Sequence, residues 1–146
     1  MVVRANDLRR DGWLAALGAV AVLSTALLPW VDNGEETLMS FEVIGSAESL
    51  GLLDGWGGAG TAQLWYAAPA LAALIVALQL IGRWALSGYV CLILGLLAVL
   101  SSVVVIRDTL EPQIGTIMTL VCGALLVVLG GRIDLFRSDV RSIQPW

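Results

Sequence analysis

The chain has 146 residues and a formal net charge of −4, and 58% of its residues are hydrophobic while only 14% are charged. Soluble domains are usually about 45–50% apolar and about 25% charged, so this composition excludes an ordinary soluble domain and indicates an integral membrane protein. The sequence contains no histidine, which removes the commonest general base and metal ligand, and its eight basic residues are all arginines.

Residues 1–12 are polar, and residues 13–30 form the first predicted membrane span. The span contains no ionisable side chain, and Trp13 and Trp30 bracket it as tryptophans do at membrane interfaces. A helix of this length covers about 27 Å, close to the ~30 Å of a bilayer core. A basic start before an apolar run is also typical of a signal peptide. No good cleavage site follows Leu28, however, so we expect the segment to be retained.

Residues 31–63 are the longest segment outside the apolar runs. From Thr37 to Ile44 apolar and polar residues alternate, which predicts a strand. A lone strand is not stable, so it needs a partner in the same loop or in another subunit. Ser46 is expected to cap a short helical turn that runs to Leu53, before a glycine-rich stretch over 55–60.

Three further spans are predicted over 64–81, 86–106 and 114–131. Gly82, Arg83 and Trp84 form a tight turn, so the second and third spans are expected to be antiparallel neighbours. Residues 107–113 form the turn before the last span. The predicted fold is therefore an all-α membrane protein, a four-helix transmembrane bundle with one short strand or hairpin in the loop 31–63.

The tail, residues 132–146, allows two interpretations. Ile133, Phe136, Val140 and Ile143 fall at helical spacing, which predicts a basic amphipathic helix lying in the membrane interface. A frayed charged tail that serves only topology fits the same residues.

The distribution of arginines predicts the orientation. Seven of the eight arginines fall in the termini and the 82–84 turn, and only Arg107 falls on the other side. Cytoplasmic segments are enriched in arginine, so both termini are expected in the cytoplasm of a bacterial inner membrane. The loop 31–63 and the 107–113 turn then face outward with eight acids: Asp32, Glu35, Glu36, Glu42, Glu48, Asp54, Asp108 and Glu111.

Motifs for ligands do not withstand inspection. Gly55, Gly57 and Gly60 match a dinucleotide fingerprint, but no strand–helix unit surrounds them. The acidic run from Asp32 to Glu36 lacks the length and the closing glutamate of a calcium loop. Cys91 and Cys122 lie at predicted depths that differ by roughly 10 Å, too far apart for a disulfide. We therefore expect no cofactor and no nucleic acid partner.

The predicted spans contain no ionisable residue, and such residues mark ion and proton paths within membranes. The spans are instead rich in small residues, which let helices approach closely in lipid. Most of these should pack one subunit, and some could face a partner. The interface candidates, with two aromatic residues of the loop, are Gly95, Ala98, Gly115, Thr119, Gly123, Phe41 and Trp56.

Three features resemble a loose group of small actinobacterial four-span membrane proteins. They are a first span that closes in Leu28-Pro29-Trp30, a glycine-rich outer loop with a short strand, and three tightly connected spans. The group includes the membrane protein associated with tryptophan operons. Its functions are mostly unassigned, so the resemblance implies a fold and no site. Some proteins of this size and type are accessory subunits of envelope or respiratory complexes.

The leading hypothesis is a non-catalytic accessory subunit packed against larger integral-membrane proteins, in a respiratory-chain supercomplex first and a cell-envelope machine second. The alternative is a small homo-oligomer that binds or transports a lipid or quinone, in a cavity near Pro69 and Gln79. A third possibility is an enzyme that uses a metal held by Glu35, Glu36 and Asp54.

Overall fold

The computed structural model describes residues 5–32, 37–47, 64–108 and 112–142. This part of the chain is mostly helical, with one short two-stranded sheet. Its elements, in chain order, are α1 (Ala5–Ala26), β1 (Pro29–Asp32), β2 (Thr37–Met39), α2 (Ser40–Ala47), the 3₁₀ turn η1 (Leu64–Ala67), α4 (Ala68–Leu80), α5 (Trp84–Asp108) and α6 (Ile114–Ser142).

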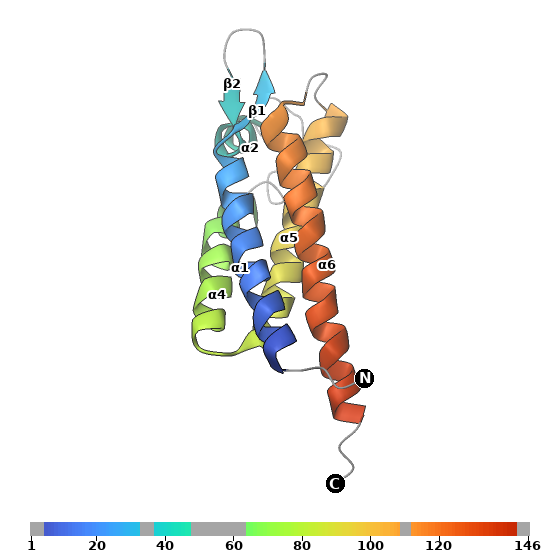
Figure 1. Cartoon of the computed structure of the whole chain (residues 1–146). Helices are drawn as coiled ribbons and strands as arrows, with labels where there is room; N and C mark the ends of the chain where they lie inside the picture. The colour runs from blue at the N-terminus through green and yellow to red at the C-terminus, as the bar shows by residue number, and fades with distance from the viewer. Residues whose placement is uncertain (1–4, 33–36, 48–63, 109–111, 143–146) are drawn as a thin grey trace.

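The four long helices run side by side, and β1, β2 and α2 gather at one end of them (Figure 1). We call these three elements the cap, and the two ends of the bundle the capped and uncapped ends. The helices α1 and α5 each contact both α4 and α6. Gly82, with a φ of 78°, makes the turn between α4 and α5 at the uncapped end, a backbone conformation that glycine adopts without steric cost.

Glycines bring α5 and α6 into direct backbone contact. A Cβ atom placed on Gly95 would lie 2.8 Å from the carbonyl oxygen of Gly123 and 2.9 Å from the amide nitrogen of Val127. About two turns further toward the uncapped end, a Cβ on Gly130 would lie 2.8 Å from the carbonyl oxygen of Gly88. Two glycine pairs therefore face each other, the close approach that small residues permit between helices.

Two helices of the described chain are long and apolar enough to cross a membrane, Trp84–Arg107 and Ile114–Ile133, and Leu64–Leu80 is a shorter apolar helix. Only 33% of the most apolar stretch of each long helix is buried inside the protein. The expectation of a largely helical protein with membrane-compatible helices is therefore confirmed. The total of four spans stays a prediction.

The first predicted helix had the wrong limits. It begins at Ala5, within the segment that was expected to be a polar terminus, and it ends at Ala26 rather than Trp30. A proline restricts the residue before it to extended conformations and cannot continue a helix, so the chain leaves the helix before Pro29. Pro29 and Trp30 then form the start of β1.

The predicted strand over 37–44 is correct only for its first three residues. β2 pairs antiparallel with β1, so its partner lies within the chain, and from Ser40 onward the backbone is helical. The Glu42 carboxylate accepts a hydrogen bond from the Met39 amide at 2.9 Å. A glutamate at the third helical position that closes back on the capping residue is a helix-start signal, and here it overrides the alternation. Ser46 lies inside α2 rather than before a helix, and 48–53 lie outside the described residues.

The tail is helical as far as Ser142, but it is not a separate helix. α6 continues without interruption through Gly130 and Gly131 (Figure 1). The predicted amphipathic segment therefore extends the axis of the last bundle helix instead of turning into the plane of an interface.

The α5–α6 contact yields a test. In Gly95→Ala the added methyl would meet two backbone atoms that cannot move aside, so we expect a loss of about 1–3 kcal/mol of stability, seen as a lower unfolding temperature in mild detergent. Gly131→Ala is the matched control, because a Cβ there meets no atom within 4 Å and alanine favours helix. Equal unfolding temperatures for the two variants would contradict the close glycine contact.

Candidate functional site

Polar side chains gather at both ends of the bundle. At the capped end, two fully buried tryptophans form the centre of the joint between cap and helices. The rings of Trp30 and Trp65 lie 5.3 Å apart between centroids, at 53°. The Trp65 Nε1–H donates to Ser40 Oγ at 3.2 Å, and the Ser40 hydroxyl donates to the Ala26 carbonyl at 2.7 Å. Ser40 therefore ties the start of α2 to the end of α1 and to η1.

The Trp30 carbonyl joins the cap to α6. It accepts the Gln113 amide at 2.9 Å and the Thr116 hydroxyl at 2.8 Å. Gly115 lies directly beneath, since a Cβ on it would be 2.5 Å from the Pro29 oxygen. The first turn of α6 thus docks on the strand β1 through the Gln113 amide, which a helix start leaves without an intrahelical partner, and through the Thr116 side chain.

Deeper in the bundle, a threonine pair links α1 to α6. The Thr119 hydroxyl donates to Thr25 Oγ1 at 2.9 Å, and the Thr25 hydroxyl donates to the Val22 carbonyl at 2.9 Å. Both threonines are buried. Their hydroxyls therefore satisfy one another and the backbone, and they serve to hold the two helices together.

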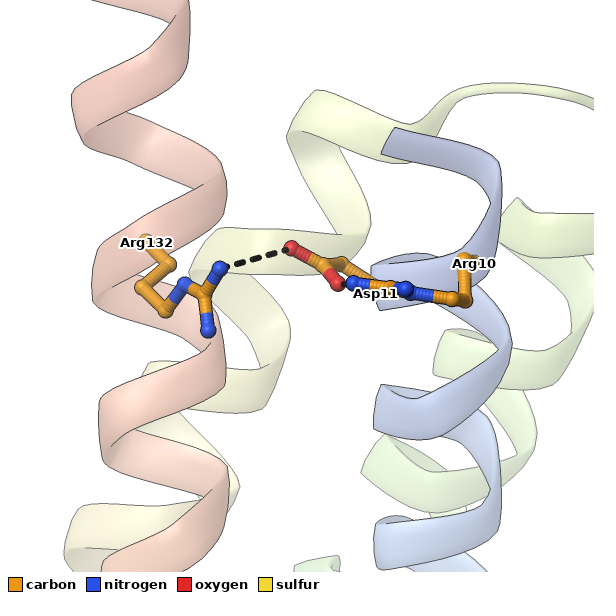
Figure 2. A network of polar contacts seen from close by, with 3 residues as sticks. All are labelled: Arg10, Asp11 and Arg132. Carbon is orange, nitrogen blue, oxygen red and sulfur yellow. Dashed lines mark ion pairs between the residues drawn. The ribbon is translucent and has the colours of Figure 1, made fainter. Parts of the chain in front are cut away.

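The uncapped end holds a different chemistry, a buried carboxylate between two arginines (Figure 2). Asp11 of α1 is only 2% exposed. Arg132 of α6 places Nη2 3.8 Å from Oδ2, and Arg10 places Nε 3.9 Å from Oδ1. The two arginine side chains are 53% and 69% exposed. A buried charge is tolerated when opposite charges compensate it, and these two guanidinium groups supply that compensation.

Gln79 of α4 packs next to this cluster. Its Nε2 donates to Ser87 Oγ of α5 at 2.6 Å, and its Oε1 lies against Gly12, the residue after Asp11. Gln79 is buried, whereas Pro69 is exposed and lies about 15 Å away along the same helix. The cavity expected near these two residues therefore stays a prediction.

Five of the predicted interface candidates are buried within the chain, where they pack its own helices and strand. They are Gly95, Ala98, Gly115, Thr119 and Gly123. Phe41 is half-buried and stacks on the exposed Tyr66 ring at 5.9 Å between centroids. Trp56 lies outside the described residues. The small residues are thus occupied by packing inside one subunit, and they leave aliphatic side chains to face outward.

The described residues include neither a disulfide nor a cluster of metal-binding side chains. Cys91 and Cys122 are both free thiols, as their predicted depths imply. Over residues 5–32, 37–47, 64–108 and 112–142, no group of three or more acidic or cysteine side chains is arranged to hold a metal ion. The predicted metal carboxylates Glu35, Glu36 and Asp54 lie outside these ranges.

Comparison with known protein families, with characterised proteins and with solved structures finds no match to this chain. The sites above therefore stand on their own geometry.

The joint at the capped end can be tested at Ser40. Ser40→Ala removes the acceptor of the buried Trp65 N–H, and an unsatisfied buried donor costs about 1–3 kcal/mol. We expect unfolding at a lower fraction of SDS in mixed micelles. Ser24→Ala is the control, because the exposed Ser24 hydroxyl bonds only to the Val20 carbonyl of its own helix. A Ser40 variant as stable as the Ser24 variant would contradict the role of Ser40.

Proposed function

We propose that the four long helices all span a bacterial inner membrane. The observation that carries this proposal is the outward surface of the bundle, where each helix exposes large aliphatic side chains. Leu17 of α1 is 65% exposed, Leu80 of α4 is 70%, Ile93 of α5 is 54% and Leu125 of α6 is 58%. Soluble monomers rarely expose contiguous apolar patches on this scale, whereas a lipid environment requires them.

The lengths of the two remaining helices support the same proposal. The η1 turn and α4 together rise about 28 Å, at about 2.0 Å per 3₁₀ residue and 1.5 Å per α residue. α1 rises about 33 Å. The η1–α4 segment is close in length to a hydrocarbon core of about 30 Å. The part of α1 after Asp11, residues 12–26, rises about 22 Å and reaches that thickness only together with residues 27–30, which follow it. The capped end then faces outward and the arginine-rich uncapped end faces the cytoplasm.

Within this membrane bundle we propose a non-catalytic accessory role. Polar side chains inside the bundle form hydrogen bonds that connect its elements: Thr119 with Thr25, Gln79 with Ser87, and Trp65 with Ser40. Helix association in lipid depends on packing and on such bonds. The surface available to another protein is the aliphatic flank together with the cap. Contact with larger integral-membrane subunits of a respiratory or cell-envelope complex fits such a surface.

Single-cysteine labelling tests the topology. In a chain with Cys91 and Cys122 replaced by alanine, Glu35→Cys is expected to react with a membrane-impermeant maleimide on whole cells. Ser138→Cys is expected to react only after lysis. Three spans separate the two positions in the proposal, so reaction of both from the same side would contradict it.

Mass spectrometry of a tagged chain purified in mild detergent tests the accessory role. We expect a larger integral-membrane protein in stoichiometric amount, whose identity separates the respiratory complex from the envelope complex. A monomer without a partner would contradict the proposal. A homo-oligomer that retains only a lipid or quinone would support the alternative function.

A further inference from the structure

Two stripes of exposed side chains run down neighbouring helices toward the uncapped end, and each stripe ends in an arginine. From the middle of the bundle to its end, the spacing is the same on both helices, three residues and then four, which keeps each stripe on one helix face. From the middle of the bundle to its end, the members are Leu17, Leu14 and Arg10 on α1, and Leu125, Val128 and Arg132 on α6. The four aliphatic side chains are between 44% and 65% exposed.

The two stripes converge at their charged ends. Arg10 and Arg132 both lie within 4 Å of the same buried carboxylate, that of Asp11, one on either side of it (Figure 2). α1 and α6 are in contact along their length. The two exposed apolar stripes therefore end at a pair of guanidinium groups, and both of these groups form an ion pair with the buried Asp11 carboxylate.

The two guanidinium groups of this cluster are accessible to a phosphodiester. Each guanidinium carries five N–H donors in a planar fork, and both arginine side chains are more than half exposed. Guanidinium groups bind phosphate oxygens in this geometry. Trp13, 45% exposed and one turn from Arg10, lies where tryptophans sit at membrane interfaces.

We infer that this surface binds one anionic phospholipid of the cytoplasmic leaflet. The phosphate lies on Arg10 and Arg132, and the two acyl chains follow the stripes of α1 and α6. Asp11 is a positioning residue that holds the two arginines at the junction of the helices. This inference rests on the proposed membrane embedding and orientation, because only then do the arginines lie at the headgroup level.

Native mass spectrometry of the full chain tests the site, with phosphatidylglycerol compared with phosphatidylcholine. The wild-type protein is expected to retain phosphatidylglycerol preferentially. Arg10→Gln and Arg132→Gln are each expected to weaken that retention about fivefold, from the usual contribution of one arginine near an anionic headgroup. Arg83→Gln is the matched control, because Arg83 is exposed and follows Gly82 in the α4–α5 turn at the same end of the bundle, outside the cluster. An equal loss in Arg83→Gln, or full retention in both cluster variants, would overturn the inference.

Two further measurements distinguish a lipid site from a site for soluble phosphate, and a loss of lipid binding from a failure of membrane embedding. Excess inorganic phosphate is expected to leave the lipid bound, and displacement of the lipid would show a site for soluble phosphate instead. The Arg10 side chain is 69% exposed, so Arg10→Gln should not disturb folding. It therefore tests lipid binding even if Arg132→Gln lowers the stability of the protein. Release of the wild-type chain from membranes by alkaline wash would contradict membrane embedding itself, a result distinct from loss of lipid selectivity in an embedded protein.

Discussion

The rest of the structure depends on the close approach of α5 and α6. In the membrane that we propose for this bundle there is little hydrophobic force between helices, so their association depends on how much van der Waals contact the backbones allow. At the Gly95–Gly123 and Gly88–Gly130 pairs, a carbonyl oxygen of one helix lies so close to the glycine of the other that a Cβ atom there would not fit without a shift of the backbone. α1 and α4 then pack against this pair as neighbours, since they contact each other as well as α5, and α1 also contacts α6.

The two ends of the bundle are closed by different kinds of bond, and the difference follows from their surroundings. At the capped end neutral donors meet neutral acceptors, as when the Trp30 carbonyl accepts the Thr116 hydroxyl, and these bonds remain stable where water is excluded. At the uncapped end a carboxylate meets two arginines whose long side chains reach solvent, so the cost of burying the charge is reduced.

Hydropathy and periodicity predicted the long helices well, because an unbroken apolar run of this length has few structures open to it other than a helix. The limits of α1 and β2 were less predictable from local pattern. The Leu-Pro-Trp sequence looked like the end of a span, yet the restriction that Pro29 imposes ends the helix earlier and makes Trp30 a buried joint. The alternation after Thr37 looked like a strand, yet Glu42 at the third helical position starts α2.

The burial of Asp11 is not visible in the hydropathy of the sequence. A hydropathy window treats a charged residue as belonging to water, so an acid just before Trp13 is assigned to the cytoplasm. Its burial depends on Arg132, which is distant in sequence and adjacent only because α1 packs on α6. Ala15, Ala19 and Val22 follow Asp11 on the same buried face at helical spacing. An acid that continues the buried face of a helix therefore requires a cationic partner from the neighbouring helix, and α6 supplies it.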